Sequence, residues 1–226
     1  MKVLDHGYLH LIESWGSDEG IIESARMSTQ GGFVSWDPYG AHPKGDMGLL
    51  RYLWNHKHST PFEMAGITVE VRLPLFVVRE WHRHRTQSYS EASARYTAIP
   101  ALDYLPEITR LMNVGPTKQG RGAGEKELRI PEGTEWLNTL QLWQSIGEML
   151  YQKGLQIGVP KELARLAMSV GRYTTMRATS NLRNWLAFLA LRQAENAQWE
   201  IRQYANAVAD VIKTRFPRTY EVAVGK

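Results

Sequence analysis

The pattern of apolar and polar positions predicts two strands in the first third of the chain. Residues 8–14, YLHLIES, alternate apolar and polar side chains, which is typical of a strand. Pro74 ends a second alternating segment and can stand in the first turn of a following helix. The apolar positions of this second segment are Ile67, Val69, Val71 and Leu73. We therefore expect a half-buried strand over 67–73, with one face on the core.

Apolar residues at helical spacing predict helices over much of the remaining chain. Ser17 is the expected N-cap of a short helix over 16–28, and the next helix is expected at 47–58. Further helices are expected at 75–85, 134–156, 159–170, 180–193 and 197–216. Few strands and several helices indicate a mixed fold of the α/β (α+β) class.

Length and composition favour one folded domain. The chain has 226 residues, of which 43% are hydrophobic, and this is enough to bury a sizeable core in a single domain over 1–226. Residues 115–133 carry turn formers and charges without periodicity, so we expect a surface insertion there. The sequence has no apolar run of roughly 20 residues, and its first residues lack the plan of a signal peptide. We expect a cytoplasmic protein that contacts no membrane.

Charge and cysteine content narrow the chemistry. The formal net charge of +4 favours anionic partners such as nucleic acid, a nucleotide or a phosphorylated metabolite. Arginine outnumbers lysine, and a guanidinium suits bidentate recognition of a phosphate in a defined pocket. The chain has no cysteine, which excludes disulfides, thiolate metal sites and a cysteine nucleophile.

The segment WHRHRTQSYSEASARY, residues 81–96, concentrates positive charge beside small hydroxyl residues. If the helix over 75–85 is regular, Arg83 and Arg85 point to different sides, which suits a ligand at a subunit boundary. An extended chain after it would place Glu91, Ser93 and Arg95 on one face. A carboxylate for a sugar hydroxyl, with serine and arginine for a phosphate, would then hold a nucleotide. The alternative is a solvated basic helix end paired with surface acids.

The motif in this segment resembles a known family. RHRTQSYSEAS, residues 83–93, matches R-H-R, seven residues, S, the signature of the flavin-dependent thymidylate synthases, and ARY continues it. HSTPFE at 58–63 and SNLRNWLAFLALRQAENAQWEIRQYA at 180–205 extend the similarity over most of the chain. The resemblance implies a central twisted sheet flanked by helices and a homotetramer with active sites where subunits meet.

The resemblance also implies an activity. The family methylates carbon 5 of the uracil in dUMP, taking the carbon from methylenetetrahydrofolate and the hydride from NADPH through FAD. It uses no cysteine nucleophile, which agrees with the cysteine-free composition. No metal site is implied.

Site residues follow from the matching positions. Arg192 matches the arginine that stabilises uracil ionised at nitrogen 3, a role that a fixed guanidinium can perform because it lowers the cost of an anionic ring. Arg165 matches an arginine that reaches the phosphate from a neighbouring subunit. The implied catalytic residues are Arg192, Ser93 and His58. The implied cofactor-binding residues are Thr60, Arg83, His84, Arg85, Glu91, Asn181, Leu182, Arg183 and Ala187, with Ser28 a further candidate. The implied substrate-binding residues are Glu80, Trp81, His82, Arg83, Glu91, Ala92, Ser93, Ala94, Arg95, Arg165 and Arg192.

Five positions depart from the family pattern. They are Glu80 where glutamine is frequent, Ser90 for asparagine, Ala94 for glycine, Ala187 for a polar residue and Asn196 for histidine. A carboxylate at Glu80 could repel phosphate, or could pair with a nearby arginine or a ribose hydroxyl. UMP methylation, as in nucleoside antibiotic pathways, is therefore an alternative to dUMP methylation. A basic nucleic-acid-binding protein that holds no flavin is the alternative from a different class.

Overall fold

The computed structural model describes residues 1–112 and 128–225, and its centre is one antiparallel sheet. The strand order is β1-β2-β3-β5-β4, and each neighbouring pair is antiparallel. The strands are β1 (Lys2–Val3), β2 (Gly7–Trp15), β3 (Gly66–Pro74), β4 (Ser88–Glu91) and β5 (Tyr173–Asn181). The structure thus confirms the two strands expected from alternation and adds β1 and β5, which were not predicted.

The middle of the sheet is a long-range pairing between β3 and β5. Gly66 faces Asn181 at one end of the register and Pro74 faces Tyr173 at the other. The inward side chains of β3 have no exposed surface, as their alternation predicted: Ile67, Val69, Val71 and Leu73. β4 then pairs with β5, so the end of the basic motif is tied to the sheet edge.

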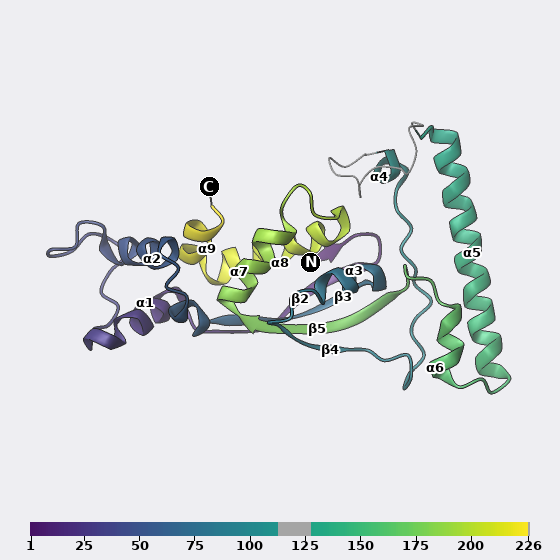
Figure 1. Cartoon of the computed structure of the whole chain (residues 1–226), viewed down its shortest axis with the longest axis horizontal. Helices are drawn as coiled ribbons and strands as arrows, with labels where there is room; N and C mark the ends of the chain where they lie inside the picture. Colours follow the sequence, from purple (N-terminus) through teal and green to yellow (C-terminus); the bar gives the residue numbers. More distant parts are fainter. Residues whose placement is uncertain (113–127, 226) are drawn as a thin grey trace.

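Helices cover one face of the sheet and lie beyond both of its ends, as Figure 1 shows. The α-helices are α1 (Asp18–Arg26), α2 (Gly45–Asn55), α3 (Leu75–Trp81), α4 (Ile108–Met112), α5 (Ile130–Gln156), α6 (Lys161–Ala164), α7 (Leu182–Arg192), α8 (Trp199–Arg215) and α9 (Pro217–Ala223). Short 3₁₀ turns are η1 (Met27–Thr29), η2 (Thr60–Glu63) and η4 (Arg165–Ala167). The Ser17 hydroxyl accepts from Gly20 N at 3.0 Å, so the predicted N-cap of α1 is confirmed.

The molecule is elongated, with the core between the sheet and the helices α3, α7 and α8. Trp81 of α3 packs its ring against Phe188 and edge-on against Trp185, both of α7. The opposite face of the sheet is polar, and there Arg177 pairs with Glu70 at 3.1 Å. Helices α1 and α2 lie at one end of the molecule, and α5 and α6 at the other.

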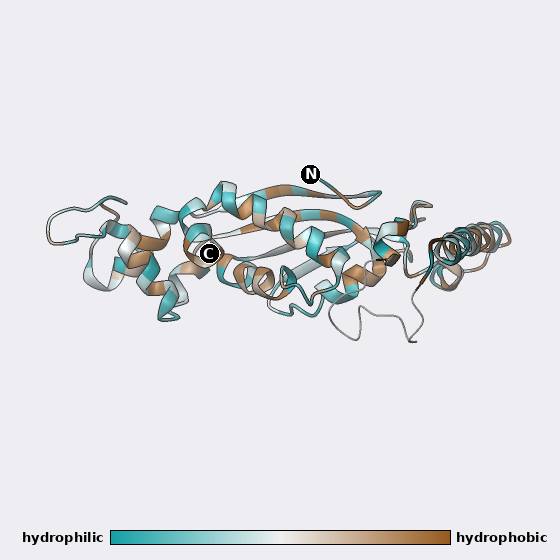
Figure 2. Cartoon of the chain, turned by 90° about the horizontal axis from the view of Figure 1, so that it is seen from above, coloured by the Kyte–Doolittle hydropathy of each residue, from teal (hydrophilic) through white to brown (hydrophobic). Residues whose placement is uncertain are grey.

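Helix α5 stands apart from the sheet (Figure 1), and Figure 2, which views it end-on, shows apolar residues on it. Its exposed apolar residues run from Ile130 to Leu150. Its start at Ile130 lies inside the insertion that was expected over 115–133. The larger part of that insertion, 115–127, lies outside the described residues. Among the residues that the structure describes, no helix is long and apolar enough to cross a membrane.

Two local expectations about the basic motif are corrected. Helix α3 ends at Trp81, so Arg83 and Arg85 lie in a turn rather than on a helix that was expected to reach residue 85. The extended strand β4 ends at Glu91, and the chain turns after Ser93, whose carbonyl accepts from Tyr96 N at 3.0 Å. The argument that a regular helix separates the two arginines is therefore wrong, as is the single extended face for Glu91, Ser93 and Arg95.

Candidate active site

The turn that follows α3 is held by buried hydrogen bonds. The Tyr89 hydroxyl donates to the carbonyl of His84 at 2.6 Å and contacts that of Trp81 at 3.2 Å. Trp81 Nε1 donates to Oε1 of Gln87 at 2.9 Å in the core. Burial raises the pKa of Tyr89 to about 12, so its hydroxyl stays a donor at neutral pH. These hydrogen bonds hold the conformation of the turn that contains Arg83, His84 and Arg85, which we call the RHR turn.

Arg192, at the end of α7, joins α7 to α3 and to this turn. Its Nε donates to Nε2 of His84 at 2.8 Å, and its Nη1 donates to Oε2 of Glu80 at 2.8 Å. Its Nη2 donates to the backbone carbonyl of Glu80 at 2.9 Å. A guanidinium with three separate acceptors has one orientation, because rotation would break all of them. Glu80 therefore pairs with an arginine, one of the two outcomes that its departure from the family pattern allowed.

His84 is neutral in this arrangement. Its Nε2 accepts from Arg192, so its ring proton must stand on Nδ1. Burial, followed by the charge of Arg192, lowers the pKa of His84 to about 4, while the charge of Glu80 acts in the opposite direction. The imidazole also lies edge-on to Phe188, with ring centroids 4.8 Å apart.

Arg83 and Arg85 differ from Arg192 in being exposed. Among the described residues, neither side chain has a hydrogen bond or an ion pair. Two exposed cations in a turn of fixed shape are free to bind an external anion.

A second group of cations gathers beyond β4. Arg95 Nε pairs with Oε2 of Glu162 at 3.2 Å, and Arg165 Nε donates to the Glu162 carbonyl at 3.2 Å. Lys161 Nζ reaches the carbonyl of Tyr96 at 3.1 Å. Arg95 and Arg165 therefore lie side by side in one chain. The expectation that Arg165 reaches the phosphate from a neighbouring subunit stays a prediction.

A third group lines an open hollow of about 760 Å³ between α1, α2 and the start of α7. Thr60 and Arg183, which were predicted as cofactor contacts, and His58, which was predicted as catalytic, all border it, as does Lys57. Arg183 Nη1 is paired there with Oε1 of Glu63 at 2.6 Å. The structure thus brings together residues that the sequence placed about 120 positions apart. Ser24 and Ala25 of α1 also border the hollow, whereas Ser28 is absent from its lining.

Some predicted contacts have side chains that are already engaged. Trp81 and Leu182 have no exposed surface, so neither residue is accessible to a ligand in this chain. Asn181 Oδ1 accepts from Asn184 N at 3.0 Å and caps α7. Ala94 is buried under the turn, whereas Ala187 is exposed on α7.

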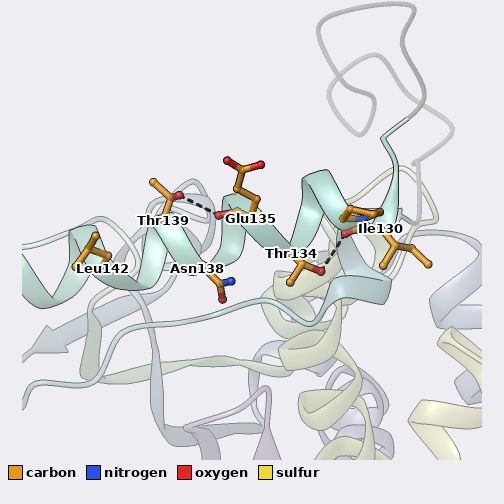
Figure 3. Close-up of a pocket in the computed structure, with 7 residues that line it drawn as sticks. Ile130, Thr134, Glu135, Asn138, Thr139 and Leu142 are labelled. Carbon is orange, nitrogen blue, oxygen red and sulfur yellow. Dashed lines mark hydrogen bonds between the residues drawn. The ribbon is translucent and has the colours of Figure 1, made fainter.

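Another hollow, of about 570 Å³, lies on the exposed surface of α5 (Figure 3). All its lining residues belong to one helix, from Ile130 to Leu142, and its polar side chains include Thr134 and Thr139, which bond back to that helix. It lies apart from the arginine groups and contributes no residue to them.

Several supporting residues were not found from the sequence. Gln87 and Tyr89 hold the turn, and Glu162 joins the two arginines of the second group. Gln87 and Tyr89 are two of the seven residues between Arg85 and Ser93 in the motif. Their position within the motif was therefore the feature of the sequence that could have identified them. Glu162 had none, because its partner Arg95 lies 67 residues away.

Comparison with known proteins identifies the family. A family model described as thymidylate synthase complementing protein matches residues 10–218. The chain is 38% identical to the flavin-dependent thymidylate synthase of Thermosipho melanesiensis, covering 97% of this chain and 91% of that one. It is 37% identical to that of Thermus thermophilus, covering 96% and 75%. The UMP/dUMP methylase PolB of Streptomyces cacaoi, solved with 5-Br dUMP, superposes with a TM-score of 0.82 at 29% identity, covering 98% and 96%. With Arg83, His84, Arg85 and Ser93 of the signature in place, the chain belongs to the flavin-dependent thymidylate synthase family.

Proposed function

We propose that this enzyme methylates carbon 5 of dUMP, with FAD as cofactor and with methylenetetrahydrofolate and NADPH as co-substrates. The observation that carries the proposal is the fixed orientation of Arg192 beside the RHR turn. The names of the relatives, which are flavin-dependent thymidylate synthases, support the reaction type. The PolB structures, which contain 5-Br dUMP and 5-Br UMP, support a pyrimidine nucleotide as substrate.

Arg192 would act on the uracil ring. A guanidinium held in place before the substrate arrives stabilises negative charge without reorganisation during the reaction. Charge on the ring at nitrogen 3 makes carbon 5 more nucleophilic. His84, neutral beside Arg192, holds the guanidinium without adding a second cation that would compete for the same charge.

The second cation group would bind the nucleotide phosphate. In the free protein, Arg95 pairs with the Glu162 carboxylate and Arg165 donates to the Glu162 backbone carbonyl. A phosphate carries more charge and more acceptor oxygens than either of these groups. The Ser93 hydroxyl, which accepts from Arg95 N at 3.3 Å, lies in the same turn. Glu91, exposed at the end of β4, remains available for a ribose hydroxyl.

The exposed cations of the RHR turn and the hollow beside α7 fit a flavin dinucleotide. Arg83 and Arg85 are exposed and unpaired among the described residues. Their guanidinium groups are therefore available to bind the oxygens of a pyrophosphate. Thr60, His58 and Arg183 border a mostly apolar hollow, and such a lining with a few polar and cationic groups suits the rest of such a molecule. FAD bound there would supply the hydride that completes the methyl group.

The three groups lie on separate parts of one chain, so we propose that each active site is assembled from several subunits of a homotetramer. Arg192 ends α7 and bonds to Glu80 of α3, whereas Arg165 directly follows α6, a helix at one end of the molecule (Figure 1). The exposed apolar side chains of α5 support an oligomer. They include Trp136, Leu142, Trp143, Ile146, Met149 and Leu150.

UMP is the second candidate substrate, because the superposing PolB is described as a UMP/dUMP methylase and was also solved with 5-Br UMP. We also propose that the enzyme is cytoplasmic, has one domain and does not bind nucleic acid polymers.

The test is incubation of the purified flavoprotein with dUMP or UMP, methylenetetrahydrofolate and NADPH, followed by mass analysis of the nucleotide. We expect a yellow protein that releases FAD on denaturation and forms dTMP. A colourless protein that takes up no FAD and binds nucleic acid with a steep salt dependence would refute it.

A further inference from the structure

The carboxylate of Glu80 lies against the guanidinium proposed to bind uracil. Oε2 of Glu80 accepts from Arg192 Nη1 at 2.8 Å, and the ion pair is partly open to solvent, with 42% of the Glu80 side chain exposed. Among the described residues, the hydrogen bonds and ion pairs of this carboxylate end on Oε2, which leaves Oε1 for a ligand. A ligand that reaches Arg192 from solvent therefore meets an acceptor and donors together.

Arg192 keeps donors for such a ligand. A guanidinium has five N–H groups, and three of them are directed at His84 and at the side chain and backbone of Glu80. Because a guanidinium is planar, the remaining N–H groups, one on Nη1 and one on Nη2, lie in the same plane as the three that are engaged. The combined edge offers N–H donors beside a carboxylate acceptor.

Neutral uracil presents the complementary edge. Its N3–H donor stands between two carbonyl acceptors, so N3–H can donate to Glu80 while a carbonyl accepts from Arg192. Arg192 alone would meet the N3–H donor with another donor, and such a contact is unfavourable until that proton leaves.

We propose that Glu80 accepts the N3 proton of uracil, so that the Glu80–Arg192 pair both recognises the imide edge and generates the nucleophilic ring. This inference rests on the proposed function. In the step, the N3–H bond breaks and its electron pair stays on the ring, while an O–H bond forms on the Glu80 carboxylate. Arg192 remains a cation beside the ring anion, so the total charge of the group is unchanged. When the methylated ring regains its neutral form, the same proton returns to N3.

The charged neighbours of Glu80 are compatible with this role. Arg192 of α7 contacts it directly, and His84 of the following turn contacts it through Arg192. Helix α8 also packs against α3, but within the described residues none of its charged side chains forms an ion pair or hydrogen bond with Glu80. Among the described residues, the Glu80 carboxylate is therefore the group placed to accept the N3 proton.

The test compares the holoenzyme with Glu80→Gln, which keeps the size of the side chain but accepts no proton. General base catalysis typically contributes about 100-fold or more, so kcat at neutral pH should fall by about that factor, with a smaller change in KM. The rate of the variant should then rise tenfold per pH unit, because solvent must take the proton, over a range where the wild-type rate is flat. Glu80→Asp, which keeps a carboxylate, should retain the flat profile at a reduced rate.

Binding gives a readout that is independent of turnover. The ring nitrogen 3 of cytosine is an acceptor and is repelled by a carboxylate, so wild type should bind dUMP much more tightly than dCMP. Glu80→Gln should lose at least about tenfold of that discrimination, since its amide can donate to cytosine. The matched control is Glu221→Gln, which breaks an exposed Arg51–Glu221 pair of the same 2.8 Å length. This control should change neither quantity.

The outcomes separate the two proposals. No methylated product from wild type would refute the proposed function. Product from wild type, together with a Glu80→Gln variant that is equally fast or faster, would overturn the proton-acceptor role alone. A slow variant with a flat pH profile and unchanged discrimination would also overturn it, because Glu80 would then only position Arg192.

Discussion

Arg192 donates its Nε–H to Nε2 of His84 across 2.8 Å, although the two residues lie 108 positions apart in the chain. The bond ties the end of α7 to the basic motif that follows α3. It also requires an uncharged imidazole, because a protonated His84 would present a donor to a donor. Burial and an adjacent cation therefore lower the pKa of His84 and keep its ring neutral, although it lies in a basic stretch of the sequence.

We predict that His84 titrates near pH 4, well below the ordinary value of 6.5. Because the unfolded chain binds this proton near pH 6.5 and the folded chain near 4, the unfolded state holds more protons between these values. The contribution of His84 to stability should therefore decrease as the pH falls from about 6.5 towards 4. The measurement is an NMR titration of the histidine ring protons, beside unfolding curves across this range.

Two variants give shifts of opposite sign in the same titration. Arg192→Ala should raise the pKa of His84 part of the way towards 6.5, since burial, the larger cause, remains. Glu80→Gln should lower it further, because the carboxylate favours the protonated ring. A wild-type midpoint near 6.5, unmoved by either substitution, would contradict the neutral His84.

The sequence predicted strands only where one face is strongly apolar. β3 was found because Ile67, Val69 and Val71 alternate with polar residues. β5 was missed although it is the partner of β3, because its inward positions are small or polar as often as apolar: Thr174, Met176, Ala178 and Ser180. Such a strand is stabilised by the core that covers it, and that core comes from α3, α7 and α8.

The motif predicted which residues matter but not how they are grouped. Residues within 83–95 are close in sequence, so their spacing alone pointed to an anion site. The pairs Arg192–Glu80 and Arg95–Glu162 join residues 112 and 67 positions apart, and only the packing of helices on the sheet brings them together. Periodicity also predicted α5 as a helix without indicating that so much of its apolar surface would be exposed.

The exposed apolar surface of α5 leads to a prediction about assembly. Ile146 is 48% exposed and Leu150 is 60% exposed one turn later on the same face. Replacing both with glutamate would leave unpaired charges in an interface, at a cost of several kcal/mol. We expect smaller species by light scattering or analytical ultracentrifugation, with an unchanged far-ultraviolet circular dichroism spectrum.

Gln141→Glu is the control for this prediction, because it adds a charge at an exposed polar position of the same helix. The oligomer of this variant should match wild type. A double glutamate variant that keeps the wild-type mass would show that this face of α5 lies outside the interface.

The grouping of the arginines predicts which inactive variants can rescue one another. Arg165 lies with Arg95 at Glu162, whereas Arg192 lies with Glu80 and His84. If each site takes one group from each of two subunits, a tetramer of mixed Arg165→Ala and Arg192→Ala chains contains some sites with both arginines. Random 1:1 mixing should then give about a quarter of wild-type activity.

Mixing Arg165→Ala with Arg95→Ala should give no rescue, because both changes fall in the same group. Subunits are exchanged by mild denaturation and refolding, and the formation of dTMP is measured. Equal rescue in both mixtures would show that the groups are divided differently between subunits, and no rescue in either would show that a single chain supplies the whole nucleotide site.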